Sequence, residues 1–341
     1  MAQPTMDDVA RVAGVSRALV SLVMREAPNV SDRRRQAVLD AAAELGYRPN
    51  ILARNLASRR TMTLGVMIND LHNPFFAEAV DGIQARADEA GYQLLLATER
   101  TGRSGQTDAI ETFLRFRVDG LILTGPRLPT PEIRAAADTC PIVLLGRTLR
   151  IPEVDTVNTD ERIGARLAVR HLFDLGHREI AHIDGGRGAG GPPRRAGYER
   201  AMRELGLDDA IRIVEGNFTE EGGVRGADQL LTGGTAPTAI FAANDLTAVG
   251  ALDRAEDLGL DVPADLSIMG YDNTAMAAMH HMSLTTIDQP REEMGRIAVD
   301  LLLERLDDDR TAAIRHVATP SLVTRSSTGP PPDPRQLRSD P

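Results

Sequence analysis

The sequence predicts a small all-helical segment followed by a larger α/β body that is divided into two lobes of parallel sheet. In residues 5–46 the apolar residues recur at helical spacing, whereas from residue 63 onward short apolar runs alternate with helical segments. Buried apolar strands that alternate with helices are typical of doubly wound parallel sheets. The chain of 341 residues is also too long for one ordinary domain, and its predicted strands are too many for one sheet.

The composition is typical of a soluble globular protein and argues against membrane and disulfide-rich classes. No run of eighteen apolar residues occurs, and the charged N-terminal stretch lacks the apolar core of a signal peptide. The single cysteine, Cys140, has no partner for an internal disulfide and suits a reducing compartment. We therefore expect a cytoplasmic protein that has no membrane partner.

The distribution of charge separates the first 60 residues from the rest. The whole chain has a net charge of −10, but residues 1–60 hold ten arginines against six acidic residues. All 39 basic residues are arginine, a side chain that can bind phosphate or guanine through two hydrogen bonds. A basic head on an acidic body is expected where only the head contacts nucleic acid.

Residues 5–46 are predicted to form three helices around a small core. Thr5, Ser16 and Ser31 each precede a helical stretch and are expected to cap it. Gly14 allows a tight turn between the first two helices, and Gly46 ends the third. Two short helices across a glycine turn in a basic segment are typical of a helix-turn-helix, although spacing alone also allows a generic helical bundle. The expected core residues are Val9, Ala10, Ala13, Leu19, Val20, Val23, Val38, Ala42 and Leu45.

The residues of this segment closely resemble the headpiece of the lac-repressor family. The patterns VAxxAGVS, NVS and LGYxPNxxAxxL occur at that family's spacing. The resemblance implies that Ser16–Met24 is a recognition helix in the major groove, with Arg17 and Ala18 at base edges. Leu22 and Arg25 depart from the family's commonest residues at their positions. The operator sequence of better-known relatives therefore cannot be transferred to this chain. The resemblance assigns phosphate contacts or helix caps to Thr5, Ser16, Ser21, Asn29 and Ser31.

Residues 49–58 are similar to the hinge that in this family becomes helical on operator DNA. The matching residues are Asn50, Ala53, Arg54 and Leu56. The resemblance implies that Leu56 from each of two subunits inserts into the minor groove at the centre of the operator. The alternative is that Leu56 is a linker residue that packs on the body.

The body is predicted to contain eight strands and five helices in alternation. Ligands of doubly wound sheets bind beyond the carboxyl ends of the strands, which in a two-lobed body is the cleft between the lobes. The expected strands cover residues 64–68, 92–98, 120–124, 142–146, 179–185, 211–216, 239–243 and 266–272. The expected helices cover residues 74–90, 104–116, 161–175, 196–205 and 246–258.

Aromatic, amide and charged residues follow several of these strands, a combination that suits a polyhydroxyl ligand. For each of these residues taken alone, a role as a helix cap or loop residue explains its position as well as contact with a ligand does. Asn73 is expected to cap its helix in any case. Residues 62–328 also resemble the periplasmic sugar-binding-protein-like core of the same family, with a pattern close to its ribose-binding branch. Gly146 stands where ribose binders carry Asp, which removes a hydroxyl acceptor. The resemblance implies an effector pocket formed by Asn73, Phe75, Phe76, Arg147, Arg194, Phe218, Asn244, Asp272 and Gln289.

Other signals argue against an enzyme. Residues 186–191 match GxGxxG, but Pro192 and Pro193 follow at once, so a flexible loop at the pocket rim is favoured over a phosphate loop. His280 and His281 are adjacent and point different ways, which makes a poor metal pair. We expect no catalytic residue, no metal and no cofactor.

These observations predict a transcriptional regulator that acts as a homodimeric repressor of a pseudo-palindromic operator, located in the cytoplasm on the nucleoid. A small polar, sugar-like effector between the lobes would control operator affinity. The alternatives are a sugar- or nucleoside-binding protein without a regulatory role and an α/β enzyme. The predicted parts are a DNA-binding domain (1–48), a hinge (49–61), an effector and dimerisation domain (62–328) and a disordered proline-rich tail (329–341).

Overall fold

The fold is that of a computed structural model, which describes residues 4–24, 27–47, 60–98, 103–307, 310 and 312–332. The chain divides into two compact units, residues 1–61 and residues 62–341. No helix in the described part of the chain is long and apolar enough to cross a membrane.

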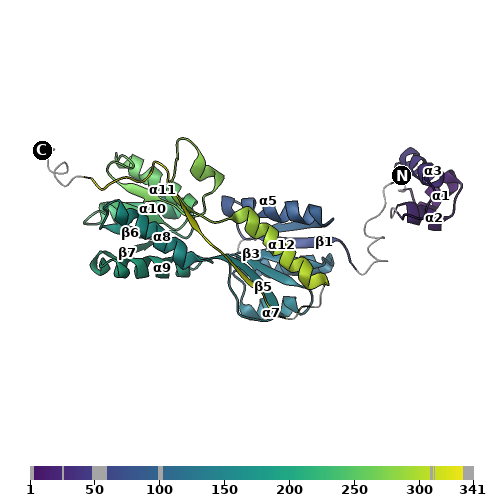
Figure 1. The fold of residues 1–341 in the computed structure, drawn as a ribbon, viewed down its shortest axis with the longest axis horizontal. Helices are drawn as coiled ribbons and strands as arrows, with labels where there is room; N and C mark the ends of the chain where they lie inside the picture. Colours follow the sequence, from purple (N-terminus) through teal and green to yellow (C-terminus); the bar gives the residue numbers. More distant parts are fainter. Residues whose placement is uncertain are drawn as a thin grey trace. The chain divides into compact units, whose positions relative to one another are not determined.

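The first unit contains the three predicted helices, α1 (Met6–Ala13), α2 (Arg17–Val23) and α3 (Asp32–Leu45) (Figure 1). The first and third end as predicted, because Gly14 and Gly46 adopt left-handed backbone angles, with φ of 65° and 62°. The buried core is Val9, Ala10, Val20, Val23, Val30, Val38, Ala41 and Ala42, with the predicted Ala13, Leu19 and Leu45 packed against it. A helix-turn-helix in an all-α unit is confirmed.

The first lobe of the body is a parallel sheet of six strands with helices on both faces. Its strand order is β11-β5-β4-β3-β1-β2. The strands are β1 (Thr63–Ile68), β2 (Gln93–Thr98), β3 (Gly120–Thr124), β4 (Ile142–Leu145), β5 (Val154–Thr159) and β11 (Arg315–Ala318). The helices are α5 (Pro74–Glu89), α6 (Arg103–Arg115), α7 (Thr130–Ala137) and α12 (Arg291–Asp307).

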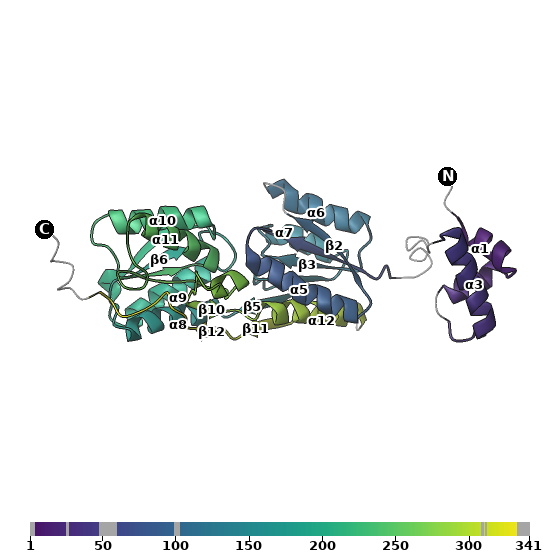
Figure 2. The ribbon, with the colours of Figure 1, turned by 90° about the horizontal axis from the view of Figure 1, so that it is seen from above.

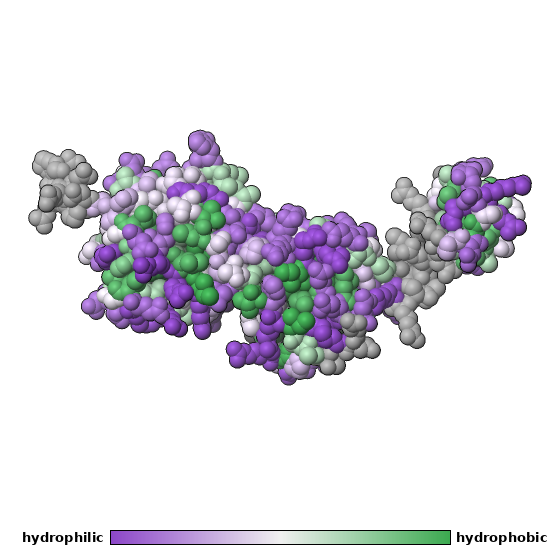
Figure 3. Space-filling model, in the orientation of Figure 1, coloured by the Kyte–Doolittle hydropathy of each residue, from purple (hydrophilic) through white to green (hydrophobic). Residues whose placement is uncertain are grey.

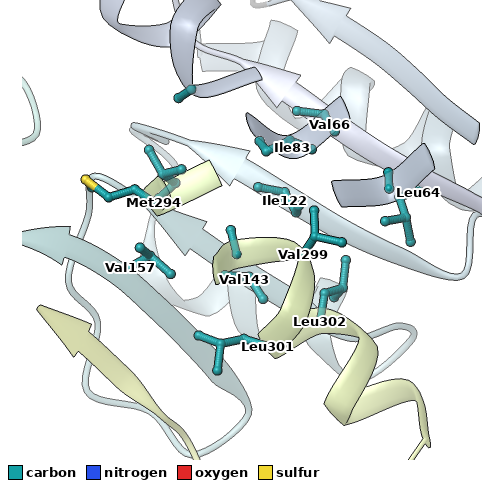
Figure 4. Close-up of a cluster of buried hydrophobic side chains, with 14 of the residues drawn as sticks. Leu64, Val66, Ile83, Ile122, Val143, Val157, Met294, Val299, Leu301 and Leu302 are labelled. Carbon is teal, nitrogen blue, oxygen red and sulfur yellow. The ribbon is translucent and has the colours of Figure 1, made fainter. Parts of the chain in front are cut away.

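Residues from distant parts of the sequence form the core of this lobe. On one face of the sheet, Val299 and Leu302 of α12 lie among Leu64, Ile122 and Val143 of the strands (Figure 4). The opposite face carries a second core, to which α6 contributes Phe113. Helix α12 follows the second lobe in the sequence, so the first lobe is complete only when the chain returns to it.

The second lobe is a four-stranded parallel sheet in the order β7-β6-β8-β9, again with helices on both faces. Its strands are β6 (Ile180–Asp184), β7 (Arg212–Glu215), β8 (Ala239–Ala242) and β9 (Ser267–Met269), beside an antiparallel pair, β10 (Thr286–Asp288) and β12 (Ser321–Val323). The helices are α8 (Glu161–Asp174), α9 (Gly191–Glu204), α10 (Glu220–Thr232) and α11 (Asp245–Asp257). Two short 3-10 helices are η1 (Asp208–Ala210) and η2 (Ala275–Ala278).

Three segments of chain connect the lobes, between β5 and α8, between β10 and α12, and between β11 and β12 (Figures 1 and 2). Two of them lie side by side, because the Asp160 amide donates a hydrogen bond to the Ala318 carbonyl at 3.1 Å. These crossings make the two-lobed α/β body that the sequence predicts, with one doubly wound parallel sheet in each lobe.

The structure corrects the start of one helix. The sequence predicts that α9 begins at residue 196, after the arginine pair, but it begins at Gly191 and includes Pro192 and Pro193 in its first turn. A proline is tolerated there because the first amides of a helix have no partner within the helix. Arg194 and Arg195 therefore lie within the helix instead of before it. The strands and helices missed from sequence are α7, β5, α10, α12, β10, β11 and β12.

The start of the predicted disordered tail is held against the second lobe. Ser267 and His177 both contact Gly329, whose carbonyl accepts hydrogen bonds from Ser267 Oγ at 3.1 Å and from His177 Nε2 at 2.9 Å. Residues 333–341 lie outside the described part of the chain. Gly329, the first residue of the predicted tail, is therefore hydrogen-bonded to the second lobe.

Candidate functional site

Helix α2 exposes one arginine and two apolar residues opposite its buried side. Val20 and Val23 are buried, whereas Arg17, Ala18 and Leu22 are exposed. The Arg17 side chain is 69% exposed and reaches one carboxylate, Asp7, at 3.8 Å. An exposed pair of this length contributes little, so the guanidinium can exchange it for another anion.

The other predicted DNA contacts of the first unit have different local roles. Thr5 and Asp8 form a capping box, in which the Thr5 hydroxyl accepts from the Asp8 amide at 3.3 Å and the Asp8 carboxylate accepts from the Thr5 amide at 3.0 Å. Ser16 caps α2 by accepting from the Leu19 amide at 3.3 Å. Ser31 stands at the start of α3 but makes no side-chain cap hydrogen bond. Asn29 is exposed and Ser21 is half-buried. The predicted contacts Asn50, Ala53, Arg54 and Leu56 lie outside the described residues.

A cavity of about 370 Å³ lies between the two lobes of the body. Its lining residues belong to segments that follow β1, β3, β4, β5, β6, β7, β9 and β10, at the carboxyl ends of the strands, as expected for doubly wound sheets. Seven of the nine residues predicted for an effector pocket line it, namely Asn73, Phe75, Phe76, Arg194, Phe218, Asp272 and Gln289. Gly146 also lines it, where the expected carboxylate is missing.

Arg147 and Asn244 do not line the cavity, which differs from the sequence prediction. Arg147 turns away and donates hydrogen bonds to the carbonyls of Pro126, at 2.9 Å, and Leu128. Asn244 caps α11 by accepting from the Thr247 amide at 2.9 Å. Arg147 thus satisfies carbonyls of a neighbouring loop and Asn244 satisfies an amide in the first turn of α11. The order of residues after a strand does not reveal either role.

Arg194 is the centre of a buried charge cluster on one wall. Its Nε lies 2.5 Å from Glu161 Oε2, and its Nη1 lies 3.6 Å from Asp272 Oδ1. The guanidinium carbon stacks 3.7 Å from the centre of the Tyr271 ring. Gln289 donates to the Asp272 carboxylate at 2.5 Å, and its own carbonyl oxygen accepts from Thr159 at 2.8 Å. These polar groups therefore hold one another in defined directions around the cavity.

Burial dominates the titration of this cluster. Removal from water raises the pKa of Asp272 to about 8, although Arg194 acts to lower it. Burial alone would lower the pKa of Arg194, but Glu161 and Asp272 outweigh it and raise that pKa. The wall therefore carries a fixed guanidinium beside the Asp272 carboxyl, whose neutral form is favoured by burial and whose charged form is favoured by Arg194.

Glu161 was missed from sequence. It lines the cavity at the first position of α8, directly after β5. The sequence pattern does not predict β5, because its sequence VDTVNT lacks an apolar run although all six residues are buried. With that strand recognised, an acidic residue just beyond its carboxyl end would have been a candidate.

The glycine-rich segment after β6 makes room for Phe218. Phe218 adopts a φ of 63°, and a Cβ atom on Gly185 would stand 2.1 Å from its ring. A Cβ atom on Gly188 would stand 2.8 Å from the same ring. Arg187, Gly188 and Ala189 line the cavity. The segment therefore lies at the rim of the cavity, as the sequence predicts. Close approach to an aromatic ring explains Gly185 and Gly188 without a bound phosphate.

We expect Gly185→Ala to push the Phe218 ring out of its position and to destabilise the body by about 1–3 kcal/mol, the usual cost of overpacking. Urea unfolding measures the loss. Gly206→Ala is a comparison at a glycine with nothing within 4 Å of the added Cβ, where the cost comes only from its φ of 72°. Equal losses in the two variants would show that the Phe218 contact is unimportant.

Two phenylalanines and an amide form part of the opposite wall. The Phe75 and Phe76 rings meet edge to face at 5.3 Å between centroids. Asn73 caps α5 as predicted, because its side-chain oxygen accepts from the Phe75 amide at 3.1 Å. Rings beside amide and charged groups suit a ligand with C–H faces and hydroxyl groups.

Two residues of the first lobe hold the loop that carries Asp272. Arg291, only 13% exposed, lies 2.7 Å from Glu78 and donates to the carbonyls of Asp272 and of Asn273, the latter at 2.6 Å. Glu78 in turn accepts from the Ala275 amide at 2.8 Å. We call Glu78 and Arg291 the interlobe clamp, because both belong to helices of the first lobe and bind backbone of the second.

Within the described residues, no three or more His, Cys, Asp or Glu side chains are grouped to hold a metal ion. Burial raises the pKa of Cys140 to about 12, so its thiol is a poor nucleophile.

Comparison with known proteins agrees with both units. Residues 5–50 match the family model described as bacterial regulatory proteins, lacI family, and residues 169–328 match a periplasmic binding protein-like domain. A ribose operon repressor of Haemophilus influenzae is 36% identical over 326 residues, which cover 95% of this chain and 98% of that protein. This chain belongs to the lacI family. It is a DNA-binding transcriptional regulator and not an enzyme.

Other relatives of this lacI-family regulator cover it almost completely. The transcriptional repressor PurR of Erwinia tasmaniensis is 35% identical over 332 residues, covering 95% of this chain and 96% of that protein. The crystal structure of the lac repressor dimer bound to operator and an anti-inducer superimposes with a TM-score of 0.86 at 32% identity. It covers 96% of this chain and all of that one.

Proposed function

We propose that this regulator is a repressor that works in the cytoplasm, on the nucleoid, as a homodimer on a pseudo-palindromic operator. Arg17, Ala18 and Leu22 on the exposed side of α2 read base edges in this proposal. Thr5, Ser16, Ser21, Asn29 and Ser31 contact phosphates or cap helices. The observation that carries the DNA-binding role is the helix-turn-helix with Arg17 exposed on α2, in a segment of ten arginines and six acidic residues within a chain whose net charge is −10.

The surface of the body is compatible with a second copy of the chain. On the face shown in Figure 3, hydrophobic residues gather in patches on both lobes among hydrophilic ones. Leu71, Leu96 and Met279 are large apolar side chains that are about half exposed or more. Apolar side chains of this kind are what a dimer interface would cover.

The effector proposed for the cavity is a small sugar-like molecule. The two phenylalanines and Phe218 would stack on its C–H faces, and Arg194, Asp272, Gln289 and Asn73 would bind its hydroxyl groups. Kinship with a ribose operon repressor favours a sugar. Gly146 argues against simple transfer of ribose, because the acceptor expected there is missing.

The interlobe clamp supports a route from cavity to operator. The Asp272 side chain lines the cavity, while its carbonyl is held by Arg291 of the other lobe. A ligand that moves Asp272 therefore changes the contacts between the lobes, and with them the spacing of the two headpieces. Such coupling is a free energy shared by two sites and can have either sign.

A salt titration of operator affinity tests the DNA-binding role. We expect the affinity for an operator selected from random DNA to fall steeply with salt, with a slope of about −0.9 per phosphate contacted. Arg17→Gln should weaken binding to that operator by about 1–3 kcal/mol, the usual worth of a base contact.

Arg115→Gln, at an exposed arginine of the body with a similar surface ion pair, is the matched control and should bind as the parent does. A flat salt response would contradict the proposal. It would favour instead a sugar-binding protein without a regulatory role.

A further inference from the structure

The charges on the inner wall of the cavity are already balanced by one another. Arg194 is buried, with 6% of its side chain exposed, and lies between the carboxylates of Glu161 and Asp272. A neutral ligand can share hydrogen bonds with this cluster, but an anion gains no uncompensated cation from it.

Two further arginines line the cavity, one from each lobe. Arg127 follows β3 of the first lobe, and Arg187 follows β6 of the second. In the described part of the chain, neither guanidinium has a carboxylate within ion-pair distance, whereas Arg195 near the same rim is paired with Asp184 and Glu199. Among these residues, Arg127 and Arg187 are therefore cations without counterions at the edge of a cavity.

The backbone on either side of Arg127 is held in place. Its amide donates to the side chain of buried Gln106 at 2.9 Å. Arg147 binds the carbonyls of the residues before and after it, Pro126 and Leu128. Since Arg147 uses its own donors in this way, it supports the position of Arg127 instead of reaching a ligand.

The loop of Arg187 is held as well. The Gly186 amide donates to Asp184 Oδ1 at 2.9 Å, and the Gly188 amide donates to the Gly185 carbonyl at 3.2 Å. Phe218 packs against Gly185 and Gly188 on both sides of the arginine. Arg187 thus extends from a tight turn and not from a long free loop.

The acidic residues described near these arginines do not pair with them. Gly146 supplies no carboxylate, and only the Gly125 amide nitrogen comes within 4 Å of the position a Cβ would take there. Asp70 also lines the cavity, with one carboxylate oxygen accepting from the His72 amide at 2.8 Å. Asp184 and Glu215 also lie near Arg187, but among the described residues neither forms an ion pair with it, so both guanidiniums remain without a paired carboxylate.

We propose that the effector is a monosaccharide derivative with a terminal anionic group, a phosphate or a carboxylate, that Arg127 and Arg187 bind from opposite lobes. This inference rests on the proposed effector role of the cavity. Guanidinium groups bind such anions through paired, charge-assisted hydrogen bonds. Because one arginine comes from each lobe, an anion between them also draws the lobes together.

A thermal-shift series with matched ligands tests this inference. Ribose, glucose and fructose are compared with their terminal phosphates and with gluconate and glucuronate, at constant ionic strength. For at least one skeleton, we expect the anionic form to give the same rise in melting temperature at a concentration roughly ten to a hundred times lower, as one or two charged hydrogen bonds imply.

Arg127→Gln/Arg187→Gln should remove most of this preference and leave the melting temperature without ligand almost unchanged. The matched control is Arg150→Gln/Arg166→Gln. Both arginines are exposed, one lies in each lobe, and neither lines the cavity. It loses the same charge and should keep the full preference.

Three outcomes would overturn the inference. If a neutral sugar binds as tightly as its anionic forms, and Phe218→Ala abolishes that binding, the cavity is an effector site for a neutral ligand. If the anionic forms act equally on the parent and on Arg127→Gln/Arg187→Gln, they bind elsewhere. If no compound shifts the melting temperature, both this inference and a sugar-like effector fail.

Discussion

Arg194→Met is expected to lower the free energy of unfolding of the body by about 3–5 kcal/mol and to abolish its response to effectors. The stability loss follows because the substitution leaves Glu161 and Asp272 buried beside each other without their cation. The response is lost because the same guanidinium lines the cavity. Urea unfolding measures the first effect, and ligand-induced thermal shift measures the second.

Arg195→Met is the matched control, since it makes the same change at the next residue of the same helix. The Arg195 side chain is 51% exposed, and its pairs with Asp184 and Glu199 are at 3.2 Å. Pairs of this kind contribute about 0–1 kcal/mol, so we expect little change. Similar losses in both variants would mean that the buried cluster has no special importance. Operator binding should survive in both, because the first unit is untouched.

Arg291→Met is expected to disconnect the cavity from the operator and to cost about 2–3 kcal/mol of stability, since hydrogen bonds to charged groups contribute roughly 1.5–3 kcal/mol. Arg291 binds the carbonyls of Asp272 and Asn273 and the carboxylate of Glu78. Without it, the loop that carries Asp272 loses its connection to α12. The variant should still bind an effector, but the effector should change operator affinity much less than in the parent.

The measurement is operator affinity with and without a saturating effector, together with urea unfolding. Arg296→Met is the control, because Arg296 lies further along α12 and pairs with Glu89 on the surface. An Arg291→Met variant whose operator affinity responds to the effector as strongly as that of the parent would show that the clamp has no part in coupling. Glu78→Gln, which keeps the size of the side chain, should reproduce a weaker form of the same defect.

The sequence predicts most of the cavity because its residues follow apolar strands. Seven predicted residues line it, and each comes shortly after a strand or begins the next helix. Arg147 and Asn244 follow strands in the same way, yet they hold neighbouring backbone. Position after a strand brings a residue to the correct edge of the sheet, but it does not determine where the side chain points.

The strand β5 shows why other parts could not be predicted. Its residues Asp155, Thr156, Asn158 and Thr159 are polar and buried. The Asp155 carboxylate is bound by Arg305, at 2.6 Å, and by Arg310, at 2.8 Å, both about 150 residues later in the chain. A polar strand can be buried only when such partners arrive, and no local pattern announces them. Glu161 was missed for the same reason.

The helix-turn-helix, its caps and the alternation of strands and helices can all be inferred from the amino-acid sequence alone. These features depend on neighbours within one or two turns of chain, where spacing and residue type suffice. Which charges are balanced and which are free became evident only from the folded chain. Arg194 is neutralised by Glu161 and Asp272, which lie far from it in the sequence on either side, whereas Arg127 and Arg187 meet no carboxylate among the described residues. Charge balance depends on distances in space, and these are set by how the two lobes pack.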